Sequence, residues 1–147
     1  MAMKISTGLA KSLLDTAGLA GSLSGMKLKI YSGTEPATAD ASLGSAVLLV
    51  TISDAGGAGA LSFEAAAVGN VIEKLSSQVW QGTNAASGTA SFCRLELASD
   101  TGASSSTEVR VQGDVGVAGK FLNLSSVALT AAAVQVVDFL SITMPTQ

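Results

Sequence analysis

The segment ASFCRLELAS, which runs from Ala90 to Ser99, shows the clearest alternation of side chains in the chain. One face of an extended backbone here carries the apolar set Cys93, Leu95 and Leu97. The opposite face carries Phe92, Arg94 and Glu96. Because successive side chains of a β-strand point to opposite faces, we predict a strand with its apolar face in the core.

Comparable runs recur along the chain, separated by short segments rich in Gly, Ser, Ala and Thr. The predicted strands lie in KLKIYS (27–32), AVLLVTIS (46–53), ALSFEA (60–65), NVIEKLS (70–76), SQVWQGT (77–83), TEVRVQGDVG (107–116), KFLNLSSVAL (120–129) and AVQVVDFLSITMP (133–145). Seven to nine strands at this spacing predict an all-β fold, an antiparallel β-sandwich. A jelly roll and an immunoglobulin-like sandwich both fit, although the missing Cys–Trp–Cys pattern weakens the second.

The N-terminal segment is the part of the chain with helical periodicity. Its apolar face consists of Ile5, Leu9, Leu13 and Leu14, and Ser6 or Thr7 can cap the helix. A helix this short is marginal alone in water, so we expect this face to pack on the sandwich or on a neighbouring subunit. The chain is thus divided into a short helical arm, residues 1–25, and a β-sandwich domain, residues 26–147.

The composition indicates a single domain with few surface charges. Of 147 residues, 48% are hydrophobic and 13% are charged, against about 25% charged in typical soluble domains. Such a chain has either a surface of Ser, Thr, Gly and Ala or a surface hidden against partners. Both descriptions suit a protein that works in an assembly.

Charge and hydropathy also exclude two classes of partner. The net charge is −3 and the eight basic residues are scattered, so we expect no nucleic acid partner. No apolar run approaches the ~20 residues that span a bilayer, so we expect no membrane partner. Lys11 and Asp15 interrupt the apolar N-terminus, which therefore lacks the continuous stretch of a secretory signal, and we expect synthesis in the cytoplasm.

The residue types that build catalytic centres are scarce. The chain has no histidine, the commonest general base, and its one cysteine, Cys93, cannot form a thiolate metal site. GDVGVAGK (113–120) comes closest to a phosphate-binding loop but lacks the required glycine spacing. Carboxylates in loops leave a calcium site open, although no D-x-D-x-D-G spacing occurs. We predict a protein that is not an enzyme and that uses no cofactor or metal.

Three of the charged residues in the predicted strands are candidates for structural ion pairs. Arg94 and Arg110 are on the outward faces of theirs, whereas Asp138 shares a face with Val136 and Leu140. A carboxylate on an apolar face needs a partner, because desolvating it unpaired is costly. We predict structural ion pairs for all three, with Arg94 or Arg110 as the partner of Asp138. The alternatives are a functional role for Asp138 and a register error or bulge in the predicted last strand.

The segment YSGTEPATAD (31–40) could be either a ligand loop, with Glu35 and Asp40 as its ligands, or a corner between strands. Gly33 releases the chain from the preceding strand, and Pro36 fixes its own φ and disfavours helix at the residue before it. Asp40 can accept hydrogen bonds from backbone amides in a turn. Because each residue has a geometric role, we interpret the segment as an architectural turn.

The order of three segments resembles a family of small virion structural proteins of tailed bacteriophages. The segments are KISTGLAKSLLDT (4–16), LKIYSGTEPATADASLG (28–44) and SQVWQGTNAASGTASFCRLELASDTGASSSTEVRVQGDVG (77–116). The matching residues are Ile30 to Thr34 with Pro36, then Val79 to Gly82, then Ala90 with Phe92 and Arg94. The resemblance covers nearly the whole chain.

The resemblance implies a jelly-roll cement or decoration protein of the virion, bound to the major capsid protein on the outside of the shell. The low charge content favours a homo-oligomer, a dimer or trimer. Its loops GTNAASG (82–88) and SDTGASSST (99–107) would contact the shell or a sister subunit. The alternatives are a tail or head–tail connector component and a sandwich that binds host glycans.

Overall fold

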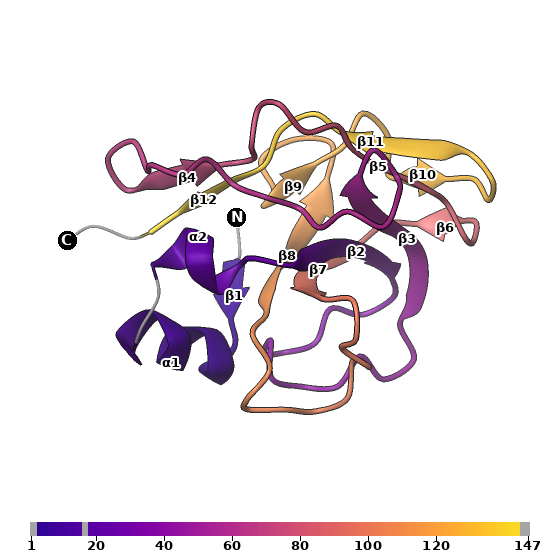
Figure 1. Ribbon diagram of the computed structural model, residues 1–147. Coiled ribbons are helices and arrows are strands. Elements are labelled where there is room, and N and C mark those ends of the chain that lie inside the picture. Colours follow the sequence, from indigo (N-terminus) through magenta and orange to yellow (C-terminus); the bar gives the residue numbers. More distant parts are fainter. Residues whose placement is uncertain (1–2, 16–17, 145–147) are drawn as a thin grey trace.

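The computed structural model describes residues 3–15 and 18–144, and it shows an all-β protein with antiparallel sheets and two short helices (Figure 1). In chain order the elements are β1 (Met3–Ile5), α1 (Thr7–Asp15), α2 (Leu19–Ser22), β2 (Met26–Ser32), β3 (Val47–Asp54), β4 (Val71–Glu73), β5 (Trp80–Thr83), β6 (Gly88–Thr89), β7 (Phe92–Leu97), β8 (Val111–Gly116), β9 (Leu122–Asn123), β10 (Ala128–Leu129), β11 (Val134–Val137) and β12 (Ser141–Thr143). The predicted all-β class is confirmed, while the jelly-roll connectivity stays a prediction.

The main sheet has the strand order β1-β8-β7-β2-β3-β5-β11, with antiparallel neighbours throughout, and β9 pairs parallel to β8. Two small ladders, β10 with β6 and β12 with β4, complete the strands of the described residues. The register between β2 and β7 places Leu28 beside Leu95 and Lys29 beside Arg94. Since β7 and β8 place Arg94 beside Gln112, one polar row crosses the centre of the sheet.

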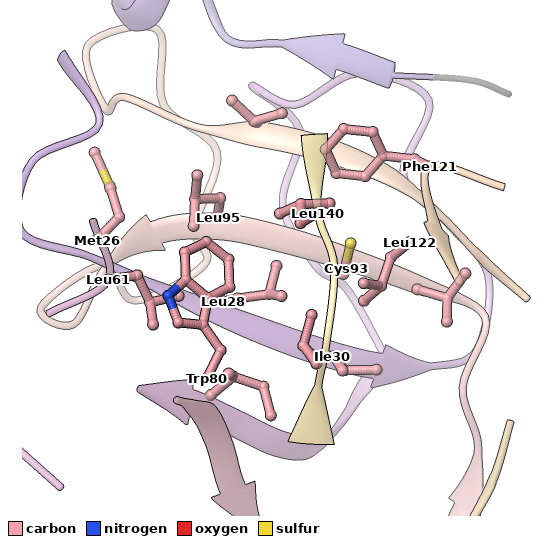
Figure 2. Close-up of a cluster of buried hydrophobic side chains, with 14 of the residues drawn as sticks. Met26, Leu28, Ile30, Leu61, Trp80, Cys93, Leu95, Phe121, Leu122 and Leu140 are labelled. Atoms are coloured by element: carbon pink, nitrogen blue, oxygen red, sulfur yellow. The ribbon is translucent and has the colours of Figure 1, made fainter. Parts of the chain in front are cut away.

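The apolar face of the sheet forms the core. Figure 2 shows side chains from β2 and β7, such as Leu28 and Cys93, meeting side chains from outside these two strands, among them Trp80 and Leu140. The Trp80 ring also packs edge-on against Phe63, with 5.4 Å between the ring centroids. The strand prediction from the alternating pattern of β7 therefore identified the correct core face.

The opposite face of the sheet is largely polar, with the stacked rings of Tyr31 and Phe92 beside its charged side chains, yet it is buried. Two long loops cover it, residues 33–46 between β2 and β3 and residues 98–110 between β7 and β8, and Figure 1 shows both on the same side of the central strands. Arg94 and Arg110, expected on outward faces, are 0% and 1% exposed as a result. Their position on the face opposite the core is as predicted, and they are buried because two long loops close over this face.

The N-terminal segment belongs to the same folded unit as the sheet. Met3–Ile5 form an edge strand on β8, so Ile5 lies before the helix rather than on its apolar face, and it is 38% exposed. Leu9 of α1 is fully buried in the core cluster and Leu13 packs against it. Residues 3–15 and 18–25 are thus not a purely helical arm but carry a strand and two helices.

The C-terminal run predicted as one strand is divided into β11 and β12. β11 ends at Val137 and β12 begins at Ser141. Val136 is 40% exposed, whereas Leu140 is 1% exposed and points into the core (Figure 2). Because β11 ends between them, Val136 faces solvent while Leu140, four residues later, faces the core.

Candidate functional site

The most unusual feature of the molecule is the layer of charged and amide side chains between the sheet and its two covering loops. We call it the polar layer, and its members are Lys29, Arg94, Glu96, Asp100, Arg110 and Gln112. Arg94, Glu96 and Gln112 are 0% exposed. Groups of this kind are rarely buried unless they are paired, so the layer is stable only through its internal hydrogen bonds.

Arg110 and Asp100 form the strongest contact of the polar layer. Nε and Nη2 of Arg110 donate to the two carboxylate oxygens of Asp100 over 2.6 and 2.7 Å. The remaining guanidinium donors reach backbone carbonyls of both loops, Ala39 at 3.1 Å and Ala103 at 2.8 Å. A planar guanidinium suits this task, because it offers five donors in a fixed arrangement.

Arg110 and Asp100 each stabilise the charged form of the other. Burial opposes ionisation of Asp100, but the hydrogen bonds from Arg110 and from the Gly102 amide, with the Arg110 charge, leave its pKa below the usual value. The hydrogen bond to Asp100 raises the pKa of Arg110. Asp100 therefore accepts within its own turn from Gly102 and across the loop from Arg110, so it fixes the shape of residues 98–110.

Arg94 and Gln112 hold the other covering loop. Nε of Arg94 donates to Oε1 of Gln112 over 2.8 Å, and Nη2 of Arg94 donates to the carbonyl of Ala41 over 2.7 Å. The amide nitrogen of Gln112 donates in turn to the carbonyl of Pro36 at 2.8 Å and to Glu35 at 3.1 Å. The carbonyls of residues 33–46 are thus matched to donors on the sheet, which fits an architectural role for this loop.

Glu96 is the second buried carboxylate of the layer, beside Asp100. Its Oε1 lies 2.9 Å from Nζ of Lys29 and accepts a hydrogen bond from the Tyr31 hydroxyl over 3.1 Å. Burial nevertheless raises the pKa of Glu96, against the opposing effect of Lys29. Oε2 of Glu96 and Nη1 of Arg94 are both buried without a hydrogen-bond partner among the described residues. The layer therefore includes two groups for which the protein itself supplies no complete partner set.

The N-terminus of α1 is attached to both loops. Ser6 caps the helix, since its hydroxyl accepts from the Leu9 amide over 3.1 Å and donates to the Glu108 carbonyl over 2.7 Å. Asp40 accepts from the Thr7 amide over 2.8 Å and also bonds the Thr7 hydroxyl. A carboxylate at this position is favourable, because the first amides of a helix are unpaired and carry partial positive charge.

The residues predicted for the turn at 31–40 are placed as follows. Gly33 has φ of 104°, a conformation that side chains disfavour. Pro36 provides a carbonyl that accepts from Lys4 as well as from Gln112. Asp40 bonds the start of α1, a contact between distant parts of the chain rather than within the turn. Glu35 pairs with Lys4 at 2.7 Å, so it is a tether and not a free ligand.

The pairing predicted for Asp138 is not what the structure shows. Asp138 is exposed in the segment between β11 and β12, while Arg110 pairs with Asp100 and Arg94 bonds Gln112 and carbonyl groups. The reason is the break after β11, which turns this position to solvent, where a carboxylate is hydrated and needs no partner. What the structure shows at this position is the end of β11 at Val137. Asp100 and Gln112 are the residues that bond Arg110 and Arg94. In the sequence they are distinguished only as polar residues near the ends of strands.

The described residues contain no group of three or more His, Cys, Asp or Glu side chains that could hold a metal ion. Cys93 is fully buried, and burial raises the pKa of its thiol. Within the same residues, no helix is long and apolar enough to cross a membrane. The polar layer is inaccessible to a substrate, so its geometry holds loops in place.

One cavity of about 410 Å³ lies between α2 and the ladder of β4 with β12. Its lining is mostly apolar and includes Leu19, Ala20, Ile72, Ile142 and Met144. No ionisable side chain lines it, so it offers no acid, base or nucleophile.

Searches with family models, curated proteins and solved structures found no match for this chain.

Proposed function

We propose that the protein is a non-enzymatic structural component of a bacteriophage virion, a cement protein that binds the outside of the capsid and stabilises it across subunit joints. The proposal starts from the resemblance of the three segments described above. The structural observation that supports it best is the fixation of two long, small-residue loops by the buried polar layer.

The outer surface of these loops is suited to close contact with another protein. In residues 98–110 the exposed positions are small, namely Ala98, Ser99, Thr101, Ala103, Ser104, Ser106 and Thr107. Small side chains have little rotamer entropy to lose on binding. The backbone beneath them is already held by Arg110 and Asp100, which lowers the ordering cost of association further. We call the exposed side chains of residues 98–110 the loop surface.

The mechanism would be thermodynamic linkage. A protein that binds the assembled shell and not its dissociated subunits stabilises the assembled state by mass action. Many copies on one lattice add their weak contacts through effective concentration. Because the loop surface has few charges, its binding should depend weakly on ionic strength.

The test is a capsid stripped of the protein and rebound at ~0.1 and ~1 M NaCl, where the screening length falls from about 10 to 3 Å. We expect rebinding at both concentrations and greater resistance of the decorated capsid to heat. Release at the higher concentration would show that charges hold the protein. A stripped capsid as resistant as the decorated one would refute the cement role.

A matched pair of variants tests the loop surface. Ala103→Lys places a long charged side chain on the exposed loop, while Ala66→Lys makes the same change at an exposed position near β4. We expect weaker rebinding for Ala103→Lys alone, with both variants equally folded. Equal binding of the two variants would exclude the loop surface as the contact.

The copy number in purified virions distinguishes the cement role from the connector role. Hundreds of copies per virion would fit a cement protein, and tens or fewer would fit a connector.

A further inference from the structure

The segment around β11 is an exposed, apolar edge. Every residue from Thr130 to Phe139 is exposed apart from Gln135 and Val137. Val134 is 60% exposed and Phe139 is 59% exposed. β11 is the last strand in the order of the main sheet, and Figure 1 shows it along the rim of the molecule.

The hydrogen-bond pattern shows which backbone groups of β11 point away from the sheet. The amide of Asn84 donates to the carbonyl of Ala133 over 2.8 Å, in register with the ladder between β5 and β11. In an antiparallel ladder, bonded positions alternate, so Gln135 and Val137 also exchange their bonds with β5. The N–H and C=O groups of Val134 and Val136 therefore face outward from the edge.

Two further contacts agree with this assignment. The neighbouring ladder between β3 and β5 uses the alternate set on β5, because Ala55 donates to Val79 and Ala85 donates to Leu49. The carbonyl of Val136 accepts a hydrogen bond from the side-chain amide of Gln135, as a carbonyl turned away from β5 can. A carbonyl oxygen has two lone pairs and can accept a second bond.

Edges of this kind are usually protected in monomeric proteins by lysine, proline, a bulge or a very short strand. The run from Ala131 to Val137 contains no charged residue and no proline. At the opposite edge of the sheet, β1 has three residues and includes Lys4. The two edges thus differ, and only the β11 edge has the composition of a surface meant for pairing.

We propose that β11 pairs with β11 of a second copy of this chain, antiparallel and about a two-fold axis at Gln135. In this register Val134 lies opposite Val136 of the partner subunit, and the symmetry repeats the pair. Each such pair exchanges two backbone hydrogen bonds, and the exposed valines cover one another. The main sheets of the two copies become one continuous sheet.

The second copy is the occupant that the edge fits best, because an antiparallel strand edge is complementary to itself under two-fold symmetry. The same register places Asp138 opposite Ala132 of the partner subunit, so no like charges oppose each other. The inference does not depend on the capsid proposal, because it concerns the purified chain alone.

The test compares Val136→Pro with Val134→Thr. Proline removes the outward N–H of Val136 and none of the bonds to β5, whereas threonine keeps the amide and the branched shape. By light scattering after gel filtration, we expect a dimer for the wild type and for Val134→Thr. Because of the two-fold symmetry, the variant lacks one intersubunit hydrogen bond from each subunit. We therefore expect Val136→Pro to raise the dimer dissociation constant about tenfold to a hundredfold.

Amide exchange locates the interface independently of that variant. At high protein concentration the amides of all four residues of β11 should be protected, and on dilution only those of Val134 and Val136 should become fast. Val68→Lys, at a position 84% exposed elsewhere, should change neither result. A monomeric wild type at millimolar concentration, a dimer unaffected by Val136→Pro, or concentration-independent exchange at Val134 and Val136 would each overturn the proposal.

Discussion

Arg110 clamps Asp100 with two hydrogen bonds of 2.6 and 2.7 Å, and both side chains are only 1% exposed. The arginine lies directly before β8, and the aspartate lies early in the loop that leads there. This contact therefore closes the loop at its base, while other donors of the same guanidinium hold Ala39 and Ala103. One side chain thus organises both loops that cover the sheet.

Arg110→Ala should destabilise the protein strongly. It leaves a buried carboxylate without its partner, and breaking a buried pair in this way typically costs about 3–5 kcal/mol. The matched control is Lys120→Ala, which breaks the more accessible pair between Lys120 and Asp114, 46% and 19% exposed, and should cost about 0–1 kcal/mol. Urea unfolding of both variants measures the difference. Equal, small effects would mean that the Arg110 pair is energetically a surface pair.

The contribution of Asp100 should disappear in acid. Its pKa is lowered in the folded protein, so the stabilisation is present above the unfolded value of about 3.9 and is lost as pH falls through the folded value. We expect the stability difference between wild type and Asp100→Asn to be constant near neutral pH and to shrink below about pH 4. A difference that stays unchanged down to pH 2 would contradict the assignment.

Glu96 should show the opposite dependence. Burial raises its pKa in the folded protein, so its favourable contribution is complete below the unfolded value of about 4.3 and is lost as pH rises through the folded value. Glu96→Gln should therefore gain stability relative to wild type as the pH is raised from about 4. Chemical unfolding at several pH values measures this trend. Glu73→Gln, at an exposed position, controls for the change in net charge.

The parts of the fold that could be predicted are those where one strand carries two chemically different faces. In β7 the alternation of Cys93 and Leu95 with Arg94 and Glu96 identified the strand and its core face. The pattern could not show that the polar face is also buried, because burial depends on a loop from residues 33–46 folding over it. Contacts such as that between Arg110 and Ala39 join positions 71 residues apart and leave no local signal.

The bounds and pairing of short strands could not be predicted from the sequence either. Apolar and polar side chains alternate from Val134 to Thr143 as in one strand. Nevertheless, β11 ends at Val137, and Asp138 turns to solvent. Leu61 and Phe63 are buried as an alternating pattern predicts, but Phe63 makes only an isolated bridge to Lys74. Local alternation indicates which side chains are apolar and inward. It does not indicate whether a neighbouring strand is in place to pair.

The helix α1 should contribute to stability through one face alone. Leu9 is 0% exposed in the core cluster, whereas Leu14 on the same helix is 87% exposed. Leu9→Ala should cost about 2–5 kcal/mol, because it removes buried methyl groups and leaves a cavity. Leu14→Ala should change stability by less than about 0.5 kcal/mol. Thermal or urea unfolding of the two variants distinguishes them, and a similar effect of both would show that α1 is not anchored by Leu9.

Asp40 should stabilise the start of α1 from outside the helix. Its carboxylate accepts from the Thr7 amide and hydroxyl, while its own carbonyl accepts from Ser105 of the second loop. Asp40→Ala removes the first contact and keeps the second, so we expect a loss of about 0.5–2 kcal/mol, the range for helix caps. Amide exchange should then accelerate at Thr7 and in the first turn of α1. Asp40→Asn keeps an acceptor oxygen without the charge, so it should restore part of the stability. If Asn were no better than Ala, the favourable interaction would be with the charge of the carboxylate rather than with its hydrogen-bonding oxygen.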